Sequence, residues 1–193
     1  MKRISALEQQ IRDYVNNANF YERHFKSHLD EWNALCVAMD TFGDSCLAME
    51  YYEDAGIGDE TGEKYLKLYG LLQAIFLQQD SIRQLYQIFL VKGKDLSPNS
   101  DSAWMKIRDL RNLTVGHPIE KRDKSKTKRC FISRVTVDSD GFQLIIWNKD
   151  KGQDEFEDVD LKSLYEMYKS EAINHLESIY QLQIEKWDAL QNH

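Results

Sequence analysis

The stretch EKYLKLYGLLQAIFLQQDSIRQLYQIFLV, residues 63–91, is the most strongly periodic part of the 193-residue chain. Apolar side chains recur along it every three or four residues, which is the repeat of one face of an α-helix. These side chains are Tyr65, Leu68, Leu72, Ile75, Ile82, Tyr86 and Phe89. The same stripe passes through position 79, which is a glutamine. The pattern predicts a long helix with one side in the core and a polar group on that side.

Helical periodicity continues on both sides of this stretch. It predicts helices over residues 4–28, 30–53 and 159–190. A shorter helix with a buried tryptophan and leucine is expected after residue 99, and Ser100 or Asp101 is the predicted cap at its start. Connectors rich in glycine or in small polar residues separate these segments.

A change of period interrupts the helices once. Residues 130–137 and 142–147 have the pattern of β-strands, and the DSDG sequence between them contains the glycine typical of a hairpin turn. We expect one mainly all-α domain over residues 1–193, an antiparallel up-and-down bundle of four to five helices. A small β-hairpin insertion is expected at about 130–148. A central sheet of four or more strands would contradict this prediction.

Charge is unevenly distributed along the chain. The net charge of −7 argues against a surface that binds nucleic acid all over. Residues 121–134 nevertheless carry seven basic side chains and one acid, whereas residues 150–160 carry six acids and one lysine. The basic run is either a solvated loop or a rim that attracts anions.

Features of secretion, membrane insertion and metal binding are missing from the sequence. The start, MKRISALEQQIRDY, has two early basic residues without an apolar run behind them, and the three cysteines are widely spaced. We expect a cytoplasmic protein with reduced thiols and no membrane segment. His24 and His28 lie four residues apart but without the HExxH pattern of a zinc site, so we expect neither a metal nor a cofactor.

The segment RNLTVGHP, residues 111–118, concentrates polar groups where the short helix should end. Arg111 lies seven residues after Trp104 and therefore continues an apolar face. A half-buried guanidinium there would hold a carboxylate or a phosphate. Arg108, one turn earlier, would add positive charge. An alternative is a purely structural ion pair from Arg111 to Asp80 or Asp40.

His117 lies six residues beyond Arg111, about 120° away on an ideal helix. Gly116 and Pro118 should end the helix, which could swing the imidazole back toward Arg111. A second copy of the chain could also supply the partner, and a structural role for His117 is a further alternative. Gln79 and its neighbour Asp80 either make a core hydrogen bond or support a functional cluster on the next helix.

RNLTVGH resembles the signature of the HEPN superfamily, the higher eukaryotes and prokaryotes nucleotide-binding domain. That signature is an arginine, usually followed by a polar residue, and a histidine after a short gap. Here Asn112 is the polar residue, and five residues separate Arg111 from His117. The resemblance implies an all-α bundle with the motif near the end of a late helix. A β-hairpin is not part of the minimal bundle of this family.

The resemblance also implies an activity and partners. Many members are metal-independent endoribonucleases of toxin–antitoxin, abortive-infection and CRISPR-associated systems, and they dimerise so that two motifs meet in one cleft. The chain would then be a homodimer with RNA as substrate and a cognate antitoxin or another protein as partner. The alternative is a non-catalytic module of the same fold that binds a partner protein or a nucleotide.

The residues suit this chemistry. Histidine can move a proton near neutral pH, and arginine can stabilise charge on phosphoryl oxygens. The predicted catalytic residues are Arg111, Asn112 and His117, and the predicted supporting polar residues are Gln79, Asp80 and Arg108. Six basic residues are predicted to bind RNA phosphates: Lys121, Arg122, Lys124, Lys126, Lys128 and Arg129.

Overall fold

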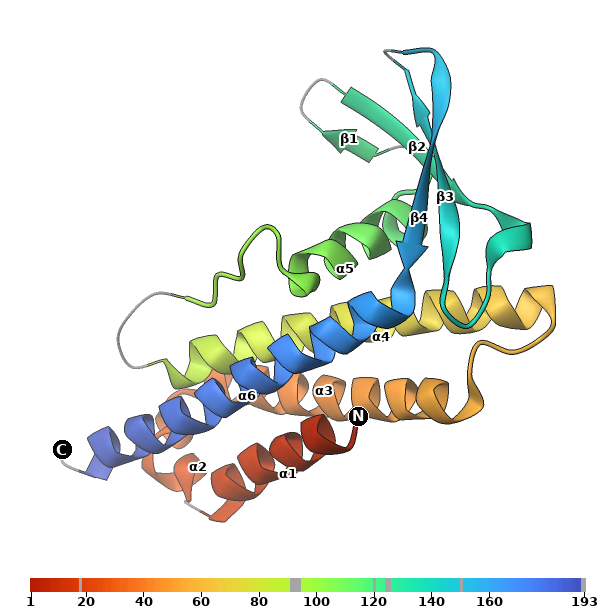
Figure 1. Cartoon of the computed structure of the whole chain (residues 1–193). Helices are drawn as coiled ribbons and strands as arrows, with labels where there is room; N and C mark the ends of the chain where they lie inside the picture. The colour runs from red at the N-terminus through yellow and green to blue at the C-terminus, as the bar shows by residue number, and fades with distance from the viewer. Residues whose placement is uncertain (18, 91–94, 120, 124–125, 150, 192–193) are drawn as a thin grey trace.

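The chain is mainly helical and carries a small antiparallel sheet (Figure 1). A computed structural model describes all residues except 18, 91–94, 120, 124–125, 150 and 192–193, and for 121–128, 189 and 191 it describes at most the backbone. The helices are α1 (Lys2–Asn17), α2 (Phe20–Arg23), α3 (Leu29–Ala55), α4 (Thr61–Phe89), α5 (Ala103–Arg111) and α6 (Leu161–Gln191). The strands are β1 (Lys121–Asp123), β2 (Lys126–Ile132), β3 (Gly141–Asn148) and β4 (Gln153–Asp160).

Consecutive long helices run in alternating directions (Figure 1). The amino group of Met1 pairs with Glu53 at the end of α3 at 2.8 Å, whereas Arg12 pairs with Asp40, nearer the start of α3, at 3.1 Å. Helices α1 and α3 are therefore antiparallel. The alternation continues through α4 and α5 to α6, and the sheet stands at the end of the helical body where α5 arrives and α6 departs.

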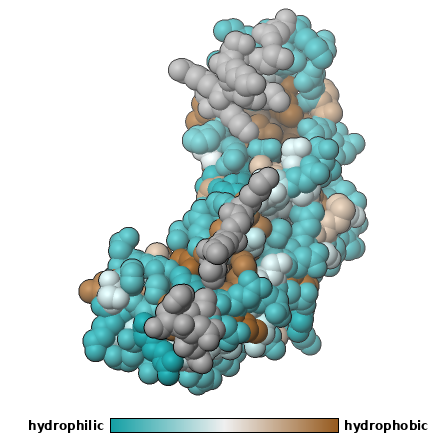
Figure 2. Space-filling view, turned by 90° about the vertical axis from the view of Figure 1, so that its left-hand side faces the viewer, coloured by the Kyte–Doolittle hydropathy of each residue, from teal (hydrophilic) through white to brown (hydrophobic). Residues whose placement is uncertain are grey.

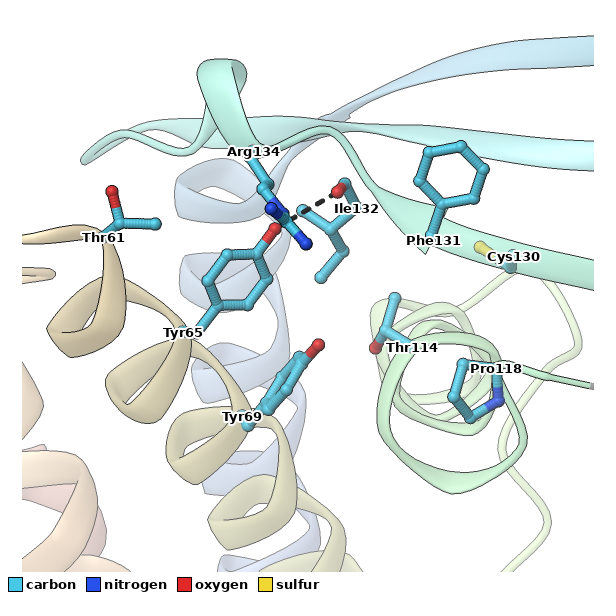
Figure 3. Close-up of a pocket in the computed structure, with 9 residues that line it drawn as sticks. All are labelled: Thr61, Tyr65, Tyr69, Thr114, Pro118, Cys130, Phe131, Ile132 and Arg134. Carbon is cyan, nitrogen blue, oxygen red and sulfur yellow. Dashed lines mark hydrogen bonds between the residues drawn. The ribbon is translucent and has the colours of Figure 1, made fainter.

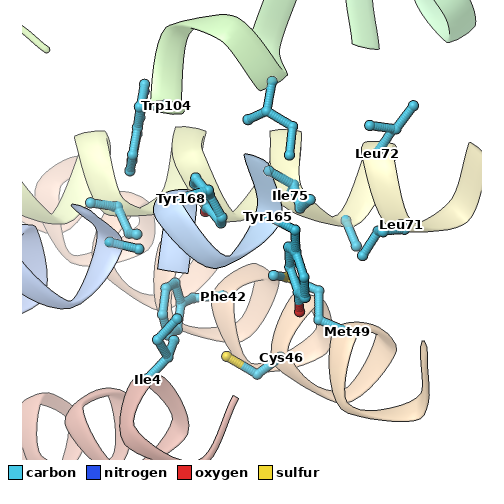
Figure 4. Packing of buried hydrophobic residues seen from close by; sticks show 14 of the residues in the cluster. Ile4, Phe42, Cys46, Met49, Leu71, Leu72, Ile75, Trp104, Tyr165 and Tyr168 are labelled. Atoms are coloured by element: carbon cyan, nitrogen blue, oxygen red, sulfur yellow. The ribbon is translucent and has the colours of Figure 1, made fainter. Parts of the chain in front are cut away.

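One apolar core joins the long helices (Figure 4). Trp104 of α5, Tyr168 of α6 and Phe42 of α3 have no exposed surface. Burying a side chain of this size contributes about 1.5–3 kcal/mol. The Tyr168 hydroxyl donates to Gln78 Oε1 of α4 at 2.8 Å, so the polar group in the core has a partner. Because Trp104 packs in the core that α3, α4 and α6 share, this packing fixes the position of the short helix α5.

The first predicted helix, residues 4–28, is wrong in its second half. Helix α1 ends at Asn17, and Asn19 has a φ of 57°, a left-handed conformation that asparagine tolerates better than most residues. The chain then makes two short helical pieces that turn Phe20 and Phe25 into the core, where neither side chain is exposed. Burial of two aromatic rings outweighs the continuation of the helix.

The cap of helix α5 lies one residue after Asp101 and two after Ser100, the two predicted caps. Ser102, and not Ser100 or Asp101, accepts a hydrogen bond from the first turn, from Met105 N at 3.2 Å. A carboxylate from α6 reinforces this cap. Glu171 accepts from the backbone N–H groups of Ala103 at 2.9 Å and Trp104 at 2.8 Å. An acid at the positive end of a helix is favourable, because it also satisfies donors that lack intrahelical partners.

The β insertion is larger than the predicted hairpin. Strands β2 and β3 form the predicted antiparallel pair, from Lys128 opposite Asn148 to Ile132 opposite Leu144. The predicted first strand, 130–137, is wrong after Ile132, where β2 ends. The DSDG turn, however, is only part of a longer connection that includes a 3₁₀ turn at Arg134–Thr136. Strands β1 and β4 extend the pair to a four-stranded antiparallel sheet in chain order. The sheet is not central, because it projects from one end of the helices (Figure 1).

Strand β4 was missed because its sequence, QDEFEDVD, has no apolar side to reveal a strand. Its residues are almost all exposed, and pairing with β3 along eight residues holds it in place. Gly152 provides the tight turn between the two strands with a φ of 63°. The acidic run therefore forms an edge strand. Figure 2 shows the side of the molecule that lies at the left of Figure 1, where the described residues are mainly hydrophilic, with small separate hydrophobic spots.

Candidate functional site

The end of α5 widens into a π-helical turn, η2 (Asn112–Gly116). His117 N donates to Asn112 O at 2.8 Å, a bond across five residues instead of four. Pro118 follows and cannot continue the helix. Single π turns in helices occur frequently at functional sites. Here the turn brings Gly116 against the Arg111 side chain, since a Cβ on Gly116 would lie 2.8 Å from Arg111 Nη1.

Amide oxygens hold the Arg111 guanidinium. Arg111 Nε and Nη2 donate to Gln73 Oε1 of α4 at 3.0 and 2.8 Å, and Nη1 donates to Asn112 Oδ1 at 3.1 Å. The predicted alternative of an ion pair to Asp80 or Asp40 is wrong. Asp80 pairs with another arginine of α5, and Asp40 pairs with one of α1. In the described part of the chain no carboxylate forms an ion pair with Arg111, so its charge is not neutralised.

Arg108 is held differently. Its Nη2 pairs with Asp80 at 2.8 Å, and its Nη1 donates to Gln79 Oε1 at 3.3 Å. The guanidinium carbons of Arg108 and Arg111 each lie 4.1 Å from the centre of the Phe76 ring, a cation–π distance. Gln79 also donates to Trp104 O at 2.8 Å. Gln79 therefore makes the core hydrogen bond that was one interpretation of it, and it also holds Arg108. Its support of a functional cluster stays a prediction.

His117 is exposed and follows the π turn. Within the described residues the structure contains no hydrogen bond between its imidazole and Arg111. Of the alternatives for His117, a return of the imidazole onto the guanidinium through a hydrogen bond therefore does not occur within the described residues of one chain. Arg111 is anchored against α4, whereas the His117 side chain faces solvent. The structure brings Arg111, Asn112 and Gly116 together and leaves His117 beside them.

Ten residues of the basic run lie on two paired strands, β1 and β2, and not in a loop. Strand β1 begins three residues after Pro118, and Lys121 stands opposite Lys128 in the register with β2. Lys124 lies outside the described residues. The side chains of four further predicted RNA-binding residues are also outside the description: Lys121, Arg122, Lys126 and Lys128. Arg129 is exposed on β2. A role for these residues in RNA binding stays a prediction.

A cleft of about 710 Å³ adjoins the motif (Figure 3). Helix α4, the π turn and strand β2 supply its walls. Its lining residues are Thr61, Tyr65, Tyr69, Thr114, Pro118, Cys130, Phe131, Ile132 and Arg134. Thr114 and Pro118 belong to the RNLTVGHP segment. The cleft and the Arg111 cluster therefore share the π turn as a common wall.

Tyr69, Gln73 and Phe76 of α4 face this region and were not predicted from the sequence. Together with Tyr65 and Asp80, which were singled out there, they are spaced by four, four, three and four residues and form one stripe of the helix. This stripe shares Tyr65 with the apolar one used to predict the helix and otherwise lies next to it. Its mixture of aromatic and amide side chains at helical spacing was the available signal. It provides both the anchor of Arg111 and the aromatic wall of the cleft.

Comparisons with protein-family models, curated proteins and solved structures found no match to this chain. The HEPN resemblance therefore rests on the motif and stays a prediction. In the described part of the chain, no helix has both the length and the apolar character needed to cross a membrane. No group of three or more histidine, cysteine, aspartate or glutamate side chains suited to a metal ion occurs among the described residues.

Proposed function

We propose that the protein is a metal-independent endoribonuclease of the HEPN type, with Arg111, Asn112 and His117 as its catalytic residues. The observation that carries this proposal is the anchoring of Arg111 by neutral amides. An arginine with a purely structural role would be expected to pair with a carboxylate, as Arg108 pairs with Asp80. Arg111 has none among the described residues, although Gln73 fixes its orientation. Its charge is therefore available to an anion such as a phosphate.

The N–H groups of Arg111 that lack an acceptor among the described residues support phosphate binding. A guanidinium has five N–H donors, and three of those of Arg111 are used by Gln73 and Asn112. About two donors remain for a ligand. Two parallel bonds to the non-bridging oxygens of one phosphate would stabilise the charge that grows there during cleavage. Asn112 would keep the fork in place through its side-chain oxygen.

His117 would move protons during this reaction. Its imidazole would take the proton of a ribose 2′-hydroxyl, and the 2′-oxygen would attack the adjacent phosphorus. The bond from phosphorus to the 5′-oxygen would break, and that oxygen would take a proton from a second imidazole. The products would be a 2′,3′-cyclic phosphate and a 5′-hydroxyl. A homodimer in which two motifs face one cleft would supply both imidazoles. A place in toxin–antitoxin systems or phage defence is part of the proposal through the resemblance alone.

A second candidate function is a non-catalytic dimeric module that binds a partner protein or a nucleotide. Two observations favour it. The net charge of −7 is unusual for a protein that must attract RNA. Arg111 and His117 are also not joined by a hydrogen bond in the described structure of one chain. The cleavage assay separates the two candidates.

The first prediction is that purified protein cuts single-stranded RNA in the presence of EDTA. Arg111→Ala and His117→Ala should each lower the cleavage rate by about 10²-fold or more, because each removes a charge or a proton carrier from the transition state. Arg111→Lys should also lose most activity, since lysine lacks the planar fork. The measurement is the rate of appearance of mapped ends that carry a cyclic phosphate.

Matched controls keep this assay interpretable. His28→Ala changes another exposed histidine, and Arg3→Ala changes an exposed arginine of α1; both should cleave like the unaltered protein. Circular dichroism should show the same helix content in all variants. Absence of cleavage with every RNA tested would favour the binding module. Cleavage that survives His117→Ala would place the active site elsewhere.

A further inference from the structure

The cleft beside the motif has the composition of a site for an unpaired base. Tyr65 and Tyr69 lie one turn apart on α4, and their rings meet edge to face with centres 5.6 Å apart. The Tyr65 hydroxyl donates to Ile132 O at 3.2 Å, which fixes this ring against β2. Tyr69 is 38% exposed, and its hydroxyl points toward Thr114 across the cleft (Figure 3). One ring is therefore held by the protein while the next is open to a ligand.

A positive charge lies over the same cleft. Arg134, at the start of the 3₁₀ turn after β2, is exposed and lines the cleft together with Tyr65 and Tyr69 (Figure 3). No ion pair joins Arg134 to any acid in the described ranges of the chain. An arginine without an acidic partner, in the same cleft as aromatic rings, suits a ligand that has both a flat ring and a negative charge.

The cleft lies beside the proposed catalytic cluster. Tyr69 precedes Gln73, the anchor of Arg111, by one helical turn, so both side chains belong to the same stripe of α4. Thr114 and Pro118 line the cleft and lie within the motif segment. A volume of about 710 Å³ is in the usual range of small-ligand sites. An RNA strand with one phosphate at Arg111 would have its next nucleotide at this cleft.

We propose that the cleft binds one unpaired nucleotide of single-stranded RNA next to the phosphate handled by Arg111, with the base against Tyr69 and the adjoining phosphate on Arg134. This inference rests on the proposed function. An RNA strand fits better than a peptide because two arginines without acidic partners flank the aromatic wall. Stacking on an aromatic ring accepts every base, so the cleft would hold the strand without strong sequence preference.

The experiment measures binding separately from cleavage. The probe is a fluorescein-labelled 2′-O-methyl oligonucleotide of mixed sequence, which cannot be cleaved because it lacks a free 2′-hydroxyl. Its affinity for the full-length protein is measured by fluorescence anisotropy at several salt concentrations in EDTA. Tyr69→Leu should weaken binding roughly 5- to 150-fold, the range for loss of one stacked base. Tyr69→Phe keeps the ring and should bind within about twofold of the unaltered protein.

Two further variants test the charge and the position. Arg134→Gln should weaken binding and reduce the slope of log affinity against log salt by about 0.7, the value for one phosphate of a single strand. Tyr51→Leu is the matched control, because Tyr51 is 65% exposed on α3 and does not line the cleft. It should bind like the unaltered protein.

Each result decides the inference. No binding of the probe, or equal binding by Tyr69→Leu and the unaltered protein, would overturn it, and the latter would leave a peptide as the better ligand. Equal losses in Tyr69→Leu and Tyr69→Phe would also overturn it, because the ring would not be the binding group. If Tyr69→Leu weakens binding while no RNA is ever cleaved, the nucleotide site stands and the proposed ribonuclease fails. If the unaltered protein cleaves RNA and Tyr69→Leu cleaves it equally well, the proposed ribonuclease stands and the nucleotide site fails.

Discussion

Gln73 orients the Arg111 guanidinium without removing its charge. Its Oε1 accepts two hydrogen bonds from the fork, at 3.0 and 2.8 Å. Sequence reasoning could predict that Arg111 is half-buried, from its spacing to Trp104. It could not predict the partner, because the choice between Gln73, Asp80 and Asp40 depends on how α5 is rotated against α4. That rotation is set by packing and by the π turn, neither of which has a periodic signal.

Replacing this amide by an acid tests whether the charge matters. Gln73→Glu keeps the size and the two acceptor contacts but pairs Arg111 with a carboxylate. We expect unfolding stability to stay equal or rise slightly, by up to about 1 kcal/mol for such a partly exposed pair. RNA cleavage should fall tenfold or more, because a neutralised guanidinium binds phosphate less well. The measurements are thermal melting and the cleavage rate, and Gln10→Glu at an exposed position of α1 is the control. An unchanged cleavage rate would show that the Arg111 charge is not used.

The short helix α5 depends on α6 for its position. The strong apolar repeats made the long helices predictable, whereas strand β4 lacked a repeat and was missed. Helix α5 was predicted from its buried residues, but its cap was not, because Glu171 comes from a helix 67 residues later in the chain. Contacts between such distant segments arise only once the bundle has assembled.

Removal of this carboxylate should loosen α5. Glu171→Ala leaves two N–H groups of the first turn without their acceptor, which costs about 1–2 kcal/mol by analogy with the loss of a helix cap. For a chain of this size the melting temperature should fall by roughly 2–8 °C. Glu177→Ala is the matched control on the same helix, because that residue makes only an exposed pair with Arg3 and should matter little. Equal melting temperatures for the two variants would contradict a role of Glu171 in holding α5.

At the scale of the whole molecule, opposite charges lie on the two edges of one sheet. The four-stranded sheet projects from the end of the bundle where the motif lies (Figure 1). The basic run includes strands β1 and β2, and the acidic run includes strand β4 at the opposite edge. Under the proposed function, an RNA strand would approach the edge at β1 and be repelled from the edge at β4. The sequence predicted this separation of charge but not the sheet that displays it.

The last prediction concerns assembly. Because Arg111 and His117 are not joined by a hydrogen bond within one described chain, and because the proposed reaction needs two imidazoles, we expect a homodimer with the segment 111–118 at its interface. Symmetric pairing would place both motifs at one cleft. Light scattering should give twice the chain mass at tens of micromolar, and a monomer there would contradict the prediction.

Subunit mixing tests whether both motifs act together. If a dimer needs two intact motifs, unaltered protein equilibrated with an equal amount of His117→Ala protein should keep only about half of its activity. The reason is that about half of the unaltered subunits then sit in mixed, inactive dimers when pairing is random. His28→Ala protein, which keeps the motif, should instead add its own activity to the mixture. Activity that stays at the full value of the unaltered protein would mean that each chain cleaves alone, and the second imidazole would have to be replaced by another proton donor.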